Sequence, residues 1–209
     1  MVTKKHILQW LENTANAMED NRQYLTKLDT AIGDADHGNN MHRGFKKVKE
    51  QLPALKGKDI GAILKAVAMT LISTVGGASG PLYGTMFMHA GNKMAGKEEL
   101  TPKEMGELLA AGLEGVKMRG KASVGEKTIV DALEPAVEAY NQSLGNGSDF
   151  QQAMNRAVAA CEKGAEETIP MIAKKGRASY LGERSKGHQD PGATSVSFII
   201  KSLNDACLN

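Results

Sequence analysis

Three aspartates, Asp29, Asp34 and Asp36, lie within a segment of eight residues that contains no lysine or arginine. Carboxylates this close repel one another unless a cation bridges them or water solvates them. Hard oxygen ligands of this kind suit Mg²⁺ or Ca²⁺, and Gly33 and Gly38 allow the backbone to fold tightly. The pattern predicts a divalent-cation site, although a solvated acidic turn before a helix explains the same residues equally well.

A calcium loop of the helix–loop–helix type does not fit this segment. If Asp34 is taken as its first ligand, Phe45 occupies the position where such a loop needs a bidentate glutamate. A helix is expected to begin at Asn39, and the free N–H groups of a helix start favour a bound phosphate. The segment therefore favours Mg²⁺ beside a phosphate group.

Three more stretches are both polar and rich in glycine, at residues 76–84, 119–131 and 176–194. The first offers N–H groups and Ser79 as a phosphate cradle. It lacks the Gly-Lys-Ser/Thr ending of a P-loop, and it equally suits a connector that lets two helices approach closely. The second contains lysines and an arginine able to contact phosphate, but surface loops often have this composition.

The last of these stretches is the richest in functional side chains. Arg177 and Arg184 are able to clamp phosphate oxygens in pairs, and Asp-Pro-Gly at 190–192 is a strong turn signal. His188 is interpreted as a hydrogen-bonding or solvent-facing residue instead of an acid or base. Together the four stretches supply acidic ligands, phosphate-sized backbone nests and cations, which are the groups that hold a magnesium–nucleotide polyphosphate.

Helical periodicity positions these stretches. Between residues 60 and 75, apolar residues recur at helical spacing up to Ile72 and Val75, with Asp59 placed as an N-cap. No segment alternates with period two, and nine aromatic residues are few for a sheet-rich core. We therefore expect an all-α fold in a single domain over residues 1–209. Helices are expected near residues 3–21, 39–52, 59–75, 80–95, 102–118, 128–144, 149–168 and 193–207.

Composition excludes several classes of protein. A formal net charge of +2, without a basic run or stacking aromatics, argues against nucleic-acid binding. The most apolar region is too short to span a bilayer, and the N-terminus does not have the pattern of a signal peptide. Cys161 and Cys207 form no disulfide framework and have no metal-ligand spacing. A cytoplasmic protein that binds neither nucleic acid nor membrane is expected.

At the same four stretches the sequence resembles the nucleotide-binding L subunit of bacterial dihydroxyacetone kinases. The matching motifs occur in the family's order and cover essentially the whole chain. They are Ile-Gly-Asp-Ala-Asp-His-Gly at 32–38, Gly-Gly-Ala-Ser-Gly-Pro-Leu-Tyr-Gly at 76–84, Gly-Glu-Lys-Thr at 125–128, and Gly-Arg-Ala-Ser-Tyr-Leu-Gly-Glu-Arg at 176–184 followed by His-Gln-Asp-Pro-Gly at 188–192. Four long motifs together are far more specific than any one of them.

The resemblance implies a barrel of eight antiparallel helices, with the nucleotide site in the loops at one end and a deep apolar interior. It implies that Asp29, Asp34 and Asp36 hold two Mg²⁺ ions that bridge the diphosphate of ADP or ATP. It also implies nucleotide contacts from His37, Gly38, Asn39, Asn40, Ala78, Ser79, Gly120, Thr128, Ile129, Arg177, Asp190, Pro191 and Gly192. Ile129 stands where relatives often carry methionine.

The reaction implied is transfer of a phosphoryl group to dihydroxyacetone, which a separate K subunit holds. No catalytic residue is therefore expected in this chain, because the acceptor site and the base belong to that partner. In one arrangement of the family the L subunit keeps ADP bound, and a phosphohistidine-carrying M subunit of the phosphoenolpyruvate phosphotransferase system rephosphorylates it. The chain has no K-like region, which favours this phosphoenolpyruvate–glycerone phosphotransferase.

Two alternatives remain at this point. The chain is also compatible with an ATP-exchanging kinase subunit that serves another acceptor, since the partner chooses the acceptor. A non-catalytic nucleotide sensor that binds a transcription regulator is the rival from another class. The complete set of aspartates and phosphate loops argues against loss of the site and disfavours that sensor.

Overall fold

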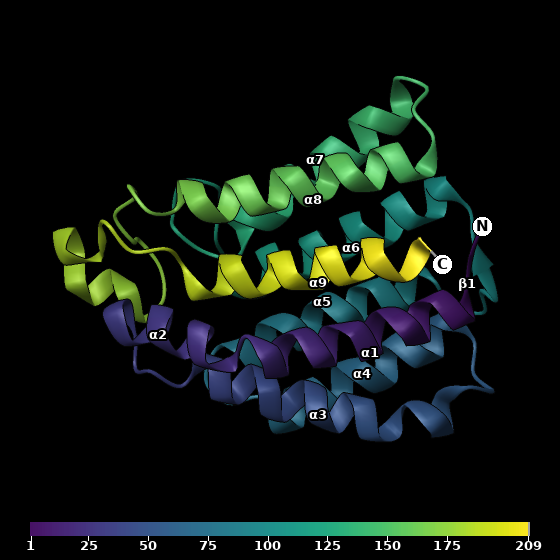
Figure 1. Ribbon diagram of the computed structural model, residues 1–209, viewed down its shortest axis with the longest axis horizontal. Helices are drawn as coiled ribbons and strands as arrows, with labels where there is room; N and C mark the ends of the chain where they lie inside the picture. Colours follow the sequence, from purple (N-terminus) through teal and green to yellow (C-terminus); the bar gives the residue numbers. More distant parts are fainter. Residues whose placement is uncertain (209) are drawn as a thin grey trace.

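The structure is a computed structural model that describes residues 1–208. Within these residues the regular secondary structure is almost entirely helical (Figure 1), which confirms the all-α expectation. The elements are β1 (Val2–Thr3), α1 (Lys4–Asp20), α2 (Arg22–Ile32), α3 (His37–Leu55), α4 (Ile60–Thr74), α5 (Ser79–Lys93), β2 (Glu99–Leu100), α6 (Pro102–Gly120), α7 (Val130–Gly145), α8 (Phe150–Glu167), the 3₁₀ helix η1 (Arg177–Ser185) and α9 (Pro191–Cys207).

Eight of the helices contact one another in a closed order. Helix α1 packs on α3, α3 on α4, α4 on α5, α5 on α6, α6 on α7, α7 on α8 and α8 on α9, and α9 packs back on α1. Their axes run roughly along the long axis of the molecule (Figure 1), so alternate connections fall at the same end. The α2–α3, α4–α5, α6–α7 and α8–α9 connections therefore meet at one end, together with η1.

The interior is apolar and partly aromatic. The ring centroid of Phe87 on α5 lies 5.5 Å from that of Trp10 on α1 and 6.3 Å from that of Phe45 on α3. The buried Trp10 indole donates its N–H to the carbonyl oxygen of Ile199, at 2.9 Å, which ties α1 to α9. Aromatic side chains thus occupy part of the interior for which the resemblance implied an apolar cavity.

Helix α4 buries most of the stripe that its sequence predicts. Ile63, Leu64 and Val67 are fully buried, and Asp59 caps the helix by accepting from the Ala62 N–H at 3.1 Å. The expectation for Ile72 is wrong, because its side chain is 45% exposed. It lies on the outer side of the α4–α5 contact, where a Cβ on Gly84 would come within 2.3 Å of it.

Two helical segments differ from the prediction. No helix was expected between residues 21 and 39, but Arg22–Ile32 form α2, which buries Leu25, Asp29 and Ile32. The buried Asp29 interrupts the apolar spacing, so periodicity alone does not reveal this helix. The second is η1, which forms within the long stretch expected to be a loop. A short antiparallel pair, β1 with β2, joins the start of α1 to the start of α6.

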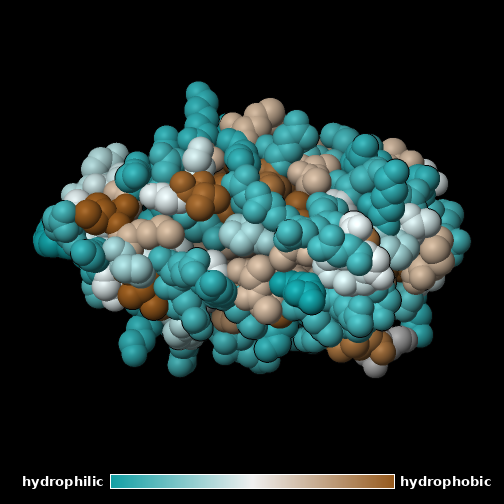
Figure 2. Space-filling model, turned by 90° about the horizontal axis from the view of Figure 1, so that it is seen from above, coloured by the Kyte–Doolittle hydropathy of each residue, from teal (hydrophilic) through white to brown (hydrophobic). Residues whose placement is uncertain are grey.

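The face of the molecule drawn in Figure 2 is mostly hydrophilic. In Figure 2 hydrophobic residues appear as small groups within a largely teal face. Across the described residues, no helix combines the length and the hydropathy that a bilayer crossing needs.

Candidate metal and phosphate site

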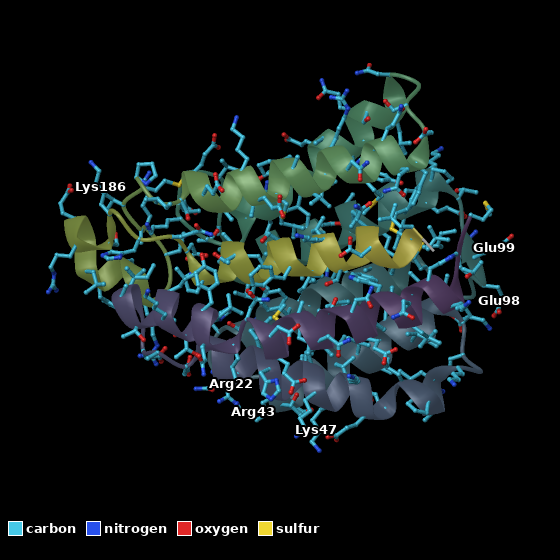
Figure 3. The ribbon with its side chains drawn as sticks, in the orientation of Figure 1. Arg22, Arg43, Lys47, Glu98, Glu99 and Lys186 are labelled. Carbon is cyan, nitrogen blue, oxygen red and sulfur yellow. The ribbon has the colours of Figure 1, made fainter. Side chains whose placement is uncertain are left out.

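A cavity of about 460 Å³ opens at the end of the molecule where the four polar stretches meet. Its lining comes from every one of them. In Figure 3, Lys186, directly after η1, marks this end, and Glu98 and Glu99 mark the opposite one. Thirteen of the sequence-predicted site residues line the cavity: Asp29, Asp34, Asp36, His37, Ala78, Ser79, Gly120, Thr128, Ile129, Arg177, Asp190, Pro191 and Gly192.

The three aspartates converge at this cavity. One carboxylate oxygen from each of Asp29, Asp34 and Asp36 lies within 4.8 Å of the others, with Asp29 buried, Asp36 half-buried and Asp34 exposed. Oxygen-only donors at this separation fit a hard divalent cation. The alternative of a fully solvated acidic turn does not fit, because Asp29 projects from the last turn of α2 into the protein.

Asp29 also shapes the segment that carries the other two carboxylates. Its Oδ2 accepts from the backbone N–H groups of Asp36 at 2.9 Å and His37 at 3.0 Å, so it caps α3 from outside that helix. Gly33 is required here, since a Cβ would lie 2.0 Å from Asp29 Oδ1. Ala35 has a left-handed φ of 62°, a conformation costly for a residue with a side chain.

One arginine reaches the acidic cluster. Arg177 Nε lies 2.9 Å from Asp34 Oδ2 and neutralises part of the negative charge. The Arg177 side chain is 71% exposed, so it is free to exchange this carboxylate for another anion. Arg184, the second arginine of the same stretch, does not line the cavity. The structure thus brings one of the two predicted clamps to the site.

A buried polar chain joins the starts of three helices beneath the cavity. The His37 ring lies between two hydroxyls, with Nδ1 3.1 Å from Ser79 Oγ and Nε2 2.8 Å from Ser195 Oγ. The Tyr83 hydroxyl lies 2.6 Å from Ser195 Oγ. Burial lowers the pKa of His37 to about 4, so the ring is neutral near pH 7. Sequence reasoning assigned no role to Ser195 or Tyr83.

Four helix N-termini border the cavity. Helices α3, α5, α7 and α9 begin at His37, Ser79, Val130 and Pro191, all of which line it. Helix starts present free N–H groups and a partial positive charge, so the arrangement favours an anion such as a polyphosphate. The position of four such starts around one cavity is the main electrostatic counterpart to the three carboxylates.

The α6–α7 connection is organised by buried charges. Asp131 accepts from the Gly125 N–H at 2.6 Å and from the Thr128 N–H at 2.7 Å, which closes the loop into a compact turn. Lys127 is buried, and its Nζ donates to the carbonyl oxygens of Thr168, Met171 and His188. Burial lowers the pKa of Lys127 below its usual range.

Asp190 is the N-cap of α9, whose first turn lies beside Ile129 of the α6–α7 connection. Its carboxylate accepts from the Ala193 N–H at 2.7 Å, the N-cap bond expected of this residue type. Its backbone N–H donates to Thr168 Oγ1 at 2.9 Å. Burial raises the pKa of Asp190 to about 7, and the neighbouring positive charge of Lys127 opposes that rise.

Three residues expected at the nucleotide lie outside the cavity lining. Gly38 faces α2, where a Cβ would come 2.1 Å from the Arg22 carbonyl oxygen. Asn39 is exposed and lines a separate outer groove between α2 and α3. Asn40 is buried and accepts from Arg43 at 2.7 Å. Gly38 therefore permits the α2–α3 contact that holds Asp29 in place.

His188 is exposed, in agreement with its interpretation as a hydrogen-bonding or solvent-facing residue.

Comparison with known proteins agrees with this geometry. The DAK2 domain family matches residues 31–205. The protein described as the PEP-dependent dihydroxyacetone kinase, ADP-binding subunit DhaL, of Escherichia coli K12 is 49% identical over 202 residues, covering 97% of this chain and 96% of that protein. The PTS-dependent dihydroxyacetone kinase, ADP-binding subunit DhaL, of Lactococcus lactis is 40% identical and covers 97% of each chain.

Solved structures give the same relation at the level of the fold. The dihydroxyacetone kinase of C. freundii in its native form superposes with a TM-score of 0.73 at 25% identity, over 95% of this chain but only 34% of the larger one. The complex of the C. freundii kinase with AMP-PNP and Mg²⁺ has a TM-score of 0.72. The sequence match, which spans most of the chain, establishes that the protein belongs to the DAK2 domain family.

Proposed function

We propose that this chain is the ADP-binding subunit of a phosphoenolpyruvate-dependent dihydroxyacetone kinase. Its similarity to several DhaL subunits over almost their whole length supports this proposal. The observation that carries it is the cavity itself, where three carboxylates and four helix starts surround one space. An acidic cluster beside anion-binding helix starts suits a metal-bound polyphosphate better than either a metal or an anion alone.

Asp29, Asp34 and Asp36 are proposed to hold two Mg²⁺ ions bridging the phosphates. The oxygen-only donor set within 4.8 Å supports this, as does the Arg177 side chain paired with Asp34. Bound Mg²⁺ supplies neutralisation of charge on the phosphate oxygens during transfer. Arg177 compensates the cluster in the absence of ions and turns to the phosphates when they are present.

The nucleotide is proposed to span the cavity from the acidic cluster to the α6–α7 connection. Ala78, Ser79 and the start of α5 supply N–H and hydroxyl donors for the phosphates. Gly120, Thr128, Ile129, Asp190, Pro191 and Gly192 are proposed to border the nucleoside. His37 supports Ser79 through its ring instead of contacting phosphate directly, because both of its nitrogens already face hydroxyls.

The closed order of contacts supports an eight-helix antiparallel barrel made of α1 and α3 to α9, in a single domain over residues 1–209. The proposed partners are a K subunit that holds dihydroxyacetone and an M subunit that delivers the phosphoryl group from its phosphohistidine. The acceptor and the base are assigned to the K subunit, so no residue of this chain is proposed as a base. A cytoplasmic location follows from this proposal.

The test is nucleotide retention by the purified protein. The wild type is expected to carry ADP through chromatography, and Asp34→Asn or Asp36→Asn is expected to release it, as measured by nucleotide content after denaturation. Unchanged content in both variants would reject the metal assignment. Glu50→Gln, on the outer face of α3 and paired with Lys47 away from the cavity lining, is the matched control, because it also replaces a carboxylate with an amide.

The source of the phosphoryl group is tested by reconstitution with a K subunit and dihydroxyacetone. Turnover is expected only when the phosphohistidine carrier and phosphoenolpyruvate are added. Equal rates with ATP alone would instead favour the ATP-exchanging alternative.

A further inference from the structure

Lys127 carries a buried charge that the proposed nucleotide contacts do not use. Its side chain is 1% exposed, although it belongs to a glycine-rich loop at the mouth of a phosphate-sized cavity. An ammonium group has three N–H donors. All three have acceptors here, namely the carbonyl oxygens of Thr168 at 2.7 Å, Met171 at 3.2 Å and His188. No donor remains to bind a phosphate.

The three carbonyls lie at the two ends of one segment. Thr168 and Met171 follow α8, and His188 precedes α9. The ammonium therefore holds together the two ends of the segment between these helices, and we call these joined ends its neck. The Gly187 N–H reinforces the neck by donating to the Ile169 carbonyl oxygen at 2.7 Å. The segment enclosed, residues 172–187, contains η1 and carries Arg177 to the acidic cluster.

The same neck supports the nucleoside side of the cavity. Thr168, whose carbonyl oxygen accepts from Lys127, also uses its hydroxyl to accept the Asp190 N–H at 2.9 Å. Asp190 in turn caps the start of α9. Through Thr168, the Lys127 ammonium is therefore connected to both the arginine side and the Asp190 side of the cavity.

We propose that Lys127 is a positioning residue for nucleotide binding. Its ammonium clamps the neck of the 172–187 segment, and so holds Arg177 and Asp190 where the nucleotide needs them, without touching the phosphates. This inference rests on the proposed function for its binding readout, but the clamp itself is a property of the chain without nucleotide.

The first test measures hydrogen exchange in the nucleotide-free, full-length protein. In Lys127→Met, the amides of residues 172–187 are expected to exchange at least about tenfold faster than in the wild type, because the neck opens locally. Lys121→Met is the matched control, since Lys121 is an exposed lysine on the same loop. Unchanged exchange in Lys127→Met, or equal acceleration in both variants, would overturn the clamp.

The second test measures the Kd for Mg·ADP by calorimetry. Lys127→Met is expected to raise it about tenfold or more, and Lys121→Met less than about twofold. Lys127→Arg, which keeps cationic N–H donors, is expected to recover part of the loss. In an Arg177→Met background the factor from Lys127→Met should shrink, because residues acting through one another are not additive. If the double variant raises the Kd by the product of the factors for Lys127→Met and Arg177→Met, Lys127 does not act through Arg177.

Failure of the proposed function can be distinguished from failure of the clamp. A wild type that binds no Mg·ADP rejects the proposed function, but leaves the exchange test of the clamp in force. If Lys127→Met lacks the helical circular dichroism of the wild type, Thr168→Val replaces it. That variant keeps the ammonium and removes the Thr168 hydroxyl, which accepts from the Asp190 N–H and donates to the Ala165 carbonyl oxygen within the end of α8. The Kd should therefore rise about threefold while residues 172–187 stay protected. An unchanged Kd would then count against the proposal.

Discussion

Two charged, glycine-containing segments face the same cavity and use their charges in opposite ways. In the acidic segment, residues 29–36, Asp34 is exposed and Asp36 is half-buried. Asp34 forms an ion pair with the exposed side chain of Arg177. In the 121–131 loop, Asp131 and Lys127 are buried and bonded to backbone groups. One segment presents charge to the cavity, and the other uses charge to build its wall.

The difference shows how a binding group is distinguished from an architectural one. A carboxylate has about four lone-pair sites, and an ammonium has three donors. Asp131 directs its lone pairs to backbone N–H groups, and Lys127 directs its donors to backbone carbonyl oxygens. Little hydrogen-bonding capacity is therefore left in either side chain for a ligand. Asp34 and Asp36 retain theirs, and their mutual repulsion is relieved when a cation binds. Available hydrogen-bonding capacity, more than residue type, identifies the site.

Metal removal should give the largest effect, and it should act on the acidic segment alone. With EDTA present, the affinity for ADP is expected to fall by about a thousandfold or more, because the diphosphate then faces three carboxylates whose charge Arg177 offsets only in part. Equilibrium dialysis with and without Mg²⁺ measures this change. Retention of ADP at full affinity in EDTA would show that the helix starts and Arg177 suffice.

Removal of Asp131 should chiefly affect folding. Asp131→Ala leaves the Gly125 and Thr128 N–H groups without their acceptor in a partly buried loop, and is expected to lower the free energy of unfolding by about 2–4 kcal/mol. Urea denaturation without nucleotide measures it. Asp34→Ala, in the exposed part of the acidic segment, should change the same quantity by less than about 1 kcal/mol. Similar losses in the two variants would abolish the distinction between the segments.

Much of this arrangement could be predicted from sequence, because the signals are local. The apolar stripe of residues 60–75, the N-cap at Asp59 and the glycine-rich breaks give the long helices, and an alternating path brings every second connection to one end. The four motifs then identify which end carries the site. Thirteen of the expected residues do line the cavity.

The missed features depend on contacts that spacing cannot show. Helix α2 was not predicted because Asp29 occupies its inner face, where periodicity requires an apolar residue. The acceptors of Lys127 lie 41, 44 and 61 residues away along the chain. Ser195 and Tyr83 are separated by 112 residues. A lysine within a glycine-rich loop looks the same in sequence whether it binds a phosphate or clamps a neck.

The wall of the cavity should also show a pH dependence. Asp190 has a folded-state pKa of about 7, raised by burial from 3.8. The folded protein therefore holds this proton more tightly than the unfolded chain, so its contribution to stability is full below pH 4 and is lost as the pH rises to about 7. Lys127 and Asp131 are the charged groups that modulate it.

Urea denaturation of the wild type and Asp190→Asn between pH 4 and 8 isolates this contribution. The asparagine keeps an N-cap acceptor and removes the titration. The stability of the wild type relative to the variant should fall as the pH rises through this range. Comparison with the variant is needed because the lowered pKa of His37 gives the opposite slope, losing stability as the pH falls from 6.5 towards 4. Parallel curves for the two proteins would rule out a buried Asp190 proton.

The smallest effect concerns backbone strain in the acidic segment. Ala35 has a φ of 62°, where glycine is more comfortable than alanine. Ala35→Gly is therefore expected to raise the free energy of unfolding by about 0.5–1 kcal/mol without displacing the neighbouring carboxylates. Thermal unfolding without nucleotide measures the gain. A loss of stability would show that the flexibility added to the unfolded chain outweighs the strain relieved.

The packing of α1 against α9 has a practical consequence. Helix α9 starts at the cavity and runs for 17 residues, about 25 Å, to the end where α1 begins. Both marked termini accordingly lie at the end remote from η1 (Figure 1). A surface tether, a fluorescent reporter or a fused enzyme attached at either terminus would leave the cavity mouth open. The protein is therefore well suited to immobilisation in assays that follow nucleotide binding.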